Sequence, residues 1–171
     1  MLKKTTAIIV MFLTAAALLA SCMKPIELQE GERYFEGSVA HEYAESCEIS
    51  FVLSADGKSV RDVRVVTKGL DYKGKYQDAS YDLIISENVG TSTHSFSGGK
   101  LDENGSITLG TSKEGLRLTV TGNSASGDMD YVYKSKPGKT PSFTVLVGTY
   151  PFTAEDRTEQ FNASKEQTKA N

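Results

Sequence analysis

Apolar and polar residues alternate along most of the chain from about residue 34 onward. The clearest runs have their apolar residues at positions 47, 49, 51 and 53, at 116, 118 and 120, and at 129, 131 and 133. A period of two places alternate side chains on opposite faces, which predicts half-buried β-strands. Less regular runs at 34–40, 60–66, 81–86, 92–97, 106–110 and 142–150 bring the expected number of strands to about nine.

Turn residues separate these runs. Asp56-Gly57 and Asn104-Gly105 suit tight hairpins, and Gly115 suits the left-handed position of a slightly longer turn. No segment after residue 22 keeps a helical period with caps at its ends. We therefore expect an all-β domain over residues 34–152, an antiparallel β-sandwich of about eight or nine short strands.

The choice of a sandwich rests on two observations. The expected strands differ in length, and a long segment at 69–80 interrupts the series of hairpins. The alternative is an up-and-down barrel of the lipocalin kind, which would be favoured by a Gly-x-Trp sequence near the first strand. The chain contains no Trp.

The pattern is different at the start of the chain. Lys3 and Lys4 precede an apolar run at 7–20, and the sequence then reads Leu-Ala-Ser-Cys, with the cysteine at position 22. Fourteen residues are too few for a helix that must cross about 30 Å of hydrocarbon, whereas they are the usual length of a secretory apolar region. Residues 1–21 are therefore predicted to be a signal peptide.

Leu-Ala-Ser-Cys resembles the lipobox of bacterial lipoproteins. This resemblance implies that the signal is cleaved before Cys22, that Cys22 receives a diacylglyceryl thioether, and that its new amino group is acylated, typically with palmitate. Met23 follows in place of the aspartate that marks inner-membrane retention, which resembles the outer-membrane class. Which leaflet the protein reaches, periplasmic or surface, stays open. The overall pattern resembles the small envelope lipoproteins of Bacteroidota.

Composition narrows the possible partners. The formal charge of the whole chain is −3, and removal of Lys3 and Lys4 with the signal gives −3 − 2 = −5. Basic residues are interspersed with acidic ones, so we expect no nucleic acid partner. With Cys22 committed to lipid, Cys47 has no partner for a disulfide, and its place in an apolar alternation predicts a small core residue.

The ends of the mature chain are polar. Residues 22–33 are expected to form a lipidated cysteine and a tether. Residues 153–171 are expected to be a polar C-terminal tail, either frayed or a short helix.

A search for catalytic chemistry finds no convincing motif. His41 and His94 are 53 positions apart without a third ligand at a metal-site spacing, and are read as ordinary surface or strand-end residues. The acidic sequence 102–105 fits a hairpin turn better than a calcium loop. No catalytic, metal or cofactor residue is assigned, and no cofactor is expected.

Tyrosines supply the one candidate binding surface. Tyr72 and Tyr76 fall within 69–80, expected to be a long loop, and tyrosine offers rigid contact area with one polar group. The alternative is that they merely decorate the loop. We therefore expect a lipid-anchored envelope protein with a non-enzymatic β-domain that binds a protein or carbohydrate partner. A structural or assembly lipoprotein of the outer membrane, or a hydrolase without a recognisable motif, is the alternative. A long unpaired edge strand would favour assembly by strand addition.

Overall fold

The structure is a computed structural model that describes residues 25–42, 44–77, 82–112, 114–134 and 144–169. For residues 70–77, 82–90, 131–134, 144–147 and 169 it describes the backbone alone. The predicted signal peptide and Cys22 lie outside the described residues.

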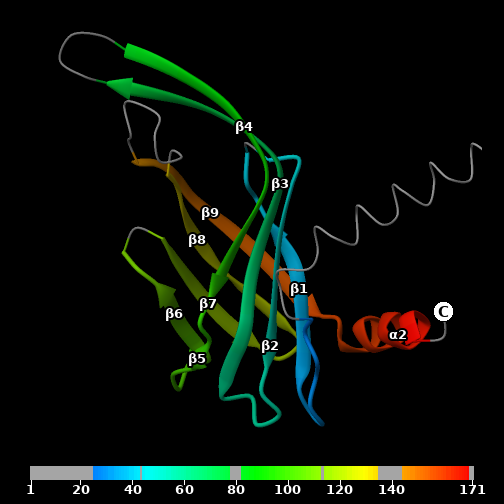
Figure 1. Cartoon of the computed structure of the whole chain (residues 1–171). Helices are drawn as coiled ribbons and strands as arrows, with labels where there is room; N and C mark the ends of the chain where they lie inside the picture. The colour runs from blue at the N-terminus through cyan, green and yellow to red at the C-terminus, as the bar shows by residue number, and fades with distance from the viewer. Residues whose placement is uncertain (1–24, 43, 78–81, 113, 135–143, 170–171) are drawn as a thin grey trace, which may run out of the picture.

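The described chain is almost entirely β-structure, which confirms the all-β, antiparallel prediction (Figure 1). The strands are β1 (Arg33–Val39), β2 (Ser46–Leu53), β3 (Ser59–Gln77), β4 (Asp82–Phe96), β5 (Gly99–Lys100), β6 (Ser106–Gly110), β7 (Gly115–Thr121), β8 (Ser124–Lys134) and β9 (Thr144–Asp156). One helix, α2 (Thr158–Lys169), follows in the C-terminal tail. Within the described residues, no helix combines the length and the apolar character needed to span a membrane.

The strands form one sheet in the order β4-β3-β2-β1-β9-β8-β7-β6, with the short β5 beside β3. Consecutive strands pair antiparallel from β1 to β4 and from β6 to β9, and β9 returns to pair with β1, so that Phe35 faces Asp156 and Val39 faces Phe152. The sheet curls around its own core as an incomplete barrel (Figure 1). The expected stacking of two sheets is not confirmed, and the connections follow the up-and-down alternative.

The core lies on the concave face of this curled sheet. Phe35, Ile49 and Phe51 are completely buried there, and the rings of Phe35 and Phe51 stack with centroids 5.0 Å apart. Cys47 is 5% exposed in the same cluster, which confirms its predicted burial. The period-two pattern therefore selects the inward side chains of nearly every strand.

Close curvature depends on glycine at inward positions. A Cβ at Gly37 on β1 would lie 1.9 Å from the Thr153 carbonyl oxygen, and a Cβ at Gly127 on β8 would lie 1.8 Å from the Arg117 carbonyl oxygen. Neither position can accept a side chain without movement of the backbone. The turns follow the predicted chemistry at Gly57 and Gly105, whose φ values are +69° and +75°. 

The turn between β6 and β7 departs from expectation. Gly110, at the end of β6, has a φ of +83° and supplies the left-handed conformation there. The prediction for Gly115 is wrong, because that residue begins β7 as a buried strand position beside the Thr111 carbonyl.

The expected long loop at 69–80 is also wrong for most of its length. Strand β3 continues to Gln77 and pairs with β4 as far as Asp82, while β2 pairs with β3 only as far as Lys68. Beyond that point β3 and β4 form a two-stranded arm that extends past the rest of the sheet (Figure 1). Uneven strand length thus reflects a long hairpin and not a change of sheet.

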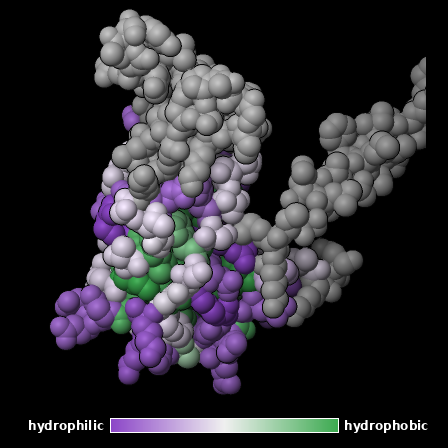
Figure 2. All heavy atoms as spheres, turned by 60° about the vertical axis from the view of Figure 1, so that its left-hand side comes forward, coloured by the Kyte–Doolittle hydropathy of each residue, from purple (hydrophilic) through white to green (hydrophobic). Residues whose placement is uncertain are grey.

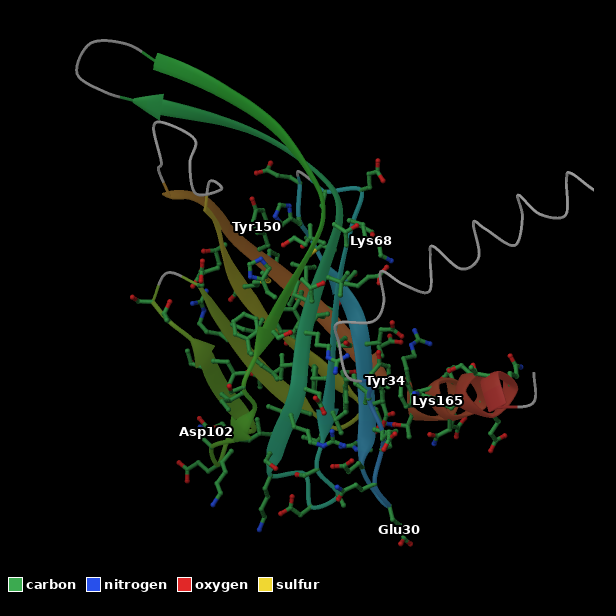
Figure 3. The ribbon with its side chains drawn as sticks, in the orientation of Figure 1. Glu30, Tyr34, Lys68, Asp102, Tyr150 and Lys165 are labelled. Atoms are coloured by element: carbon green, nitrogen blue, oxygen red, sulfur yellow. The ribbon has the colours of Figure 1, made fainter. Side chains whose placement is uncertain are left out.

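A second apolar cluster covers the outer face of β1 and β2. Ile26, Tyr34 and Val52 are buried together, and Leu28 and Phe161 pack against them. The rings of Tyr34 and Phe161 lie 4.4 Å apart, which holds α2 beside β1 (Figure 3). The segment expected to be a free tether therefore contributes a buried side chain from Ile26 onward.

Candidate functional site

The two ends of the sheet, β4 and β6, lie on the same side of the molecule without pairing to each other. At the lower end they are joined through β5 and a hairpin, in which the Asp102 amide donates to the Ser106 carbonyl at 2.8 Å. The Leu101 amide donates in turn to the carbonyl of Lys58, the residue before β3, at 2.9 Å. Above this hairpin no described strand pairs with the outer edge of β4 or of β6. We call this unpaired gap the seam.

The hydrogen-bond phase along the sheet shows which backbone groups face the seam. The Ser54 amide donates to the Ser59 carbonyl, which fixes the phase of the β2–β3 hairpin. The extra residue of β3 at the irregularity between Ser50 and Val52 reverses this phase, so that beyond it the residues of β3 whose backbone groups face β4 include Val65, the partner of His94. Because such groups alternate along an antiparallel strand, the N–H and C=O groups of the flanking residues 93 and 95 point into the seam.

Strand β4 lacks several of the features that usually protect an edge strand. Natural sheets discourage unwanted pairing with lysine, proline, short edges or covering segments. Strand β4 spans 15 residues and contains no Lys, Arg or Pro, and its two acidic residues, Asp82 and Glu87, lie in the arm; β6 contains no charged residue and no Pro but has only five residues. A typical strand has about five or six residues. The length and composition of β4 therefore suit pairing with a further strand.

Apolar side chains line the floor of the seam. Three partly buried side chains pack against the core here: Phe96 of β4, Leu101 of the β5–β6 hairpin and Ile107 of β6. Phe96 also reaches across the gap, since a Cβ at Gly110 would lie 3.0 Å from Phe96 Cε1. Figure 2 shows hydrophobic atoms at the surface between polar neighbours on this side of the molecule. The seam thus combines unpaired backbone groups with an apolar floor.

The core cluster becomes more polar toward the arm. His94 shares its face with Ser92 and Phe96, and Ser92 Oγ lies 3.5 Å from His94 Nε2. On the neighbouring strands Cys47 Sγ lies 3.3 Å from Thr67 Oγ1. The Ser92–His94 pair and the Cys47–Thr67 pair lie next to each other, because Thr67 on β3 is the register partner of Ser92 on β4.

The surroundings of the Cys47 thiol and the Ser92 hydroxyl at this polar end do not activate either group as a nucleophile. Burial raises the pKa of the Cys47 thiol, although its contact with Thr67 acts in the opposite direction. A thiol with a raised pKa holds little thiolate at neutral pH, and the thiolate is the reactive form. The Ser92–His94 distance is at the outer limit of a hydrogen bond. The arrangement is better suited to lining a surface than to covalent catalysis.

His41 lies near the end of a strand, which was one of the two expected positions, but it is buried and not at the surface. It lies two residues after the end of β1, is only 6% exposed, and stacks on Tyr150 with ring centroids 4.2 Å apart. Burial lowers its pKa below the usual value, against an opposing contribution from the charge of Glu42. Two stacked aromatic rings, one from the segment after β1 and one from β9, therefore close the core at this end.

The other sequence candidates fall at separate places. Tyr72 and Tyr76 belong to the arm, where their register partners on β4 are Glu87 and Leu83, and their side chains lie outside the described part. Asp102 accepts hydrogen bonds from the amides of Asn104 and Ser106, so the acidic sequence is a hairpin turn, as predicted. Among the described residues there is no cluster of three or more His, Cys, Asp or Glu side chains suited to a metal ion.

No protein-family model, curated protein or solved structure matches this chain. The geometry of the sheet is therefore the basis for any assignment.

Sequence reasoning missed the seam. The alternation of Thr91, Thr93 and Ser95 with Ser92, His94 and Phe96 is present, but it does not show that β4 ends the sheet. An edge strand has a partner strand on one side only, and this depends on the order of all the strands in the sheet. The absence of Lys, Arg and Pro from β4 and β6 is the one sequence signal that could have pointed to these strands.

Proposed function

We propose that this protein is a lipid-anchored component of the cell envelope, whose non-enzymatic β-domain binds an extended segment of a protein partner along the free edge of β4. The unpaired edge is the observation that carries the proposal. An added strand would accept and donate hydrogen bonds at Thr93 and Ser95, and its alternate side chains would rest near Phe96. Main-chain pairing provides affinity in this mode, and the apolar floor provides selectivity.

The anchor is part of the same proposal. Support comes from Leu-Ala-Ser-Cys ending at Cys22 and from the charged and apolar segment before it. Two or three acyl chains on one cysteine would give durable attachment, because each buried methylene contributes about 0.8 kcal/mol. Met23 in place of aspartate supports the outer membrane as the destination.

A protein partner fits the seam better than a carbohydrate. Regularly spaced N–H and C=O groups match another polypeptide backbone, whereas sugars are commonly held by exposed aromatic side chains and polar groups. Tyr72 and Tyr76 stay a predicted contact surface, and both residues belong to the part of β3 that lies in the arm. Since β4 pairs with this part of β3, a partner strand along β4 would pass beside the arm.

Site-specific photocrosslinking in intact cells tests this function. A benzophenone amino acid at Ser95, which is exposed beside the seam, should give a discrete adduct in the membrane fraction. Thr93→Pro should abolish the adduct, because it removes a donor that faces the seam while sparing the hydrogen bonds to β3. Thr93→Val is the matched control, because it keeps that donor and should retain the adduct.

Fold integrity has to be checked in the same variants. Proline at an outward N–H is tolerated on edge strands, so the melting temperature of Thr93→Pro should stay close to that of Thr93→Val. An adduct that survives Thr93→Pro would contradict pairing at β4. So would an equally strong adduct from a benzophenone at Thr121, an exposed residue at the end of β7.

A further inference from the structure

The segment before β1 is fastened to the outside of the sheet. Residues 26–32, which we call the strap, begin with the buried Ile26 and end beside β3, where Arg61 holds them at two points. Arg61 Nε donates to Glu32 Oε1 at 2.9 Å, and Arg61 Nη2 donates to the Glu27 carbonyl at 2.8 Å. Glu32 also accepts from the Gln29 amide at 2.7 Å. The strap is thus a fixed part of the domain.

Electrostatics supports the same contact. The hydrogen bond from Arg61 holds the pKa of Glu32 below its usual value, in spite of an opposing effect of burial. The Glu32 side chain is 9% exposed. A carboxylate that is charged, mostly covered and bonded to one guanidinium fixes the strap more firmly than an exposed ion pair would.

The attachment of the strap leaves very little free chain before it. Only Met23, Lys24 and Pro25 separate Cys22 from Ile26. Four Cα–Cα steps of about 3.5 Å reach at most about 14 Å, which is little more than the 10–12 Å diameter of one helix. A domain attached through Cys22 therefore cannot stand away from the bilayer, as it could on a free tether of residues 22–33.

The position of the strap also sets which side meets the lipid. Ile26 lies on the outer face of β1 and β2, beside Phe161 of α2. In the sheet order, β1 and β9 are the middle strands, and β4 and β6 are the two ends. Because the sheet is curled, its middle and its ends lie on opposite sides of the molecule. Figure 3 accordingly shows Lys165 of α2 and Asp102 of the β5–β6 hairpin on opposite sides.

We propose that the strap holds the domain against the bilayer with the outer face of β1, β2 and α2 toward the lipid, so that the seam faces away from the membrane. This inference rests on the proposed anchor at Cys22. We infer that the lipid surface covers this face, because so few residues separate Cys22 from Ile26. The seam then remains accessible to a partner from the aqueous side.

Single-tryptophan quenching measures this orientation directly, because the chain contains no Trp. The lipidated protein is reconstituted into vesicles of phosphatidylcholine and phosphatidylglycerol that contain brominated phosphatidylcholine. Ala163→Trp reports from an exposed position on α2, and Thr108→Trp reports from an exposed position on β6. We expect at least twofold stronger quenching of the α2 reporter than of the β6 reporter.

A lengthened tether is the matched control. Inserting 20 Gly and Ser residues between Pro25 and Ile26 adds a flexible segment of about 25 Å, which should abolish the difference between the two reporters. Equal quenching of both reporters with the natural tether would overturn the orientation while leaving the anchor intact. Failure of the protein to sediment with the vesicles would overturn the anchor and the orientation together.

Discussion

Phe96 on β4 and Gly110 on β6 bring the two ends of the sheet together, since a Cβ at Gly110 would lie 3.0 Å from Phe96 Cε1. The contact is made by a side chain and not by ladder hydrogen bonds. The ends of the sheet are therefore close at this level but not paired. A half-buried ring covers part of the core while the backbone groups beside it stay available.

Removing this ring should weaken the domain measurably. Phe96→Ala deletes a partly buried aromatic side chain, and we expect a loss of about 2 kcal/mol in the free energy of unfolding, below the 3–5 kcal/mol typical of a fully buried one. Urea denaturation measures the change. Thr93→Ala, at an exposed position on the same strand, should stay within about 0.5 kcal/mol. Equal stability of the two variants would show that Phe96 does not cover the core.

The fold could largely be predicted from the sequence, because the period of two selects inward residues such as Ile49 and Leu118. Turn chemistry was also readable where the geometry is local, as at Gly57. The number of layers was not readable. It depends on β9 pairing with β1, a contact between the two ends of the domain that no local pattern encodes.

The candidate site was less accessible to sequence reasoning. Residues 69–77 looked like a loop because Gly69, Gly74 and several polar residues interrupt the apolar alternation. These residues of β3 pair with β4 through backbone hydrogen bonds, which do not require an apolar alternation. In the same way, Ile26 gave no sign that it would pack on Val52, because a lone apolar residue in a polar segment has no periodicity.

Cys47 should behave as a protected thiol. Burial raises its pKa, and it is 5% exposed. A maleimide should therefore label Cys47 in the folded Cys22→Ser variant slowly. In the same variant unfolded in urea, we expect the labelling rate to be at least about a hundredfold higher. Rapid labelling of the folded protein at neutral pH would mean that Cys47 lies open to solvent and is a candidate for chemistry.

Stability should decrease in mild acid because of His41. Its folded pKa is lowered by burial, so the unfolded state binds a proton first, near pH 6.5. The contribution of neutral His41 is complete above about pH 6.5 and is lost as the pH falls toward the folded pKa. His41→Phe keeps a ring against Tyr150 and should give a flatter profile between pH 7 and pH 5 in urea titrations. Identical profiles would exclude His41 as the source.

Glu32 should contribute in a more acidic range. Its pKa is lowered by Arg61, so the contribution is present above the usual value of 4.5 and is lost as the pH falls through the lowered folded value. Glu32→Gln should cost about 1 kcal/mol at pH 7 and reduce the dependence below pH 4.5. Glu30→Gln, at an exposed position in the same segment, is the control and should change neither quantity.

Residue-by-residue amide hydrogen exchange of the mature protein, followed by NMR, tests most directly whether β4 offers an open edge. We expect an alternation along β4, with slow exchange at His94 and Phe96, whose amides face β3, and fast exchange at Thr93 and Ser95, whose amides face the seam. Protection of Thr93 and Ser95 equal to that of His94 in the isolated protein would mean that the edge is already occupied, and would contradict an open edge at β4.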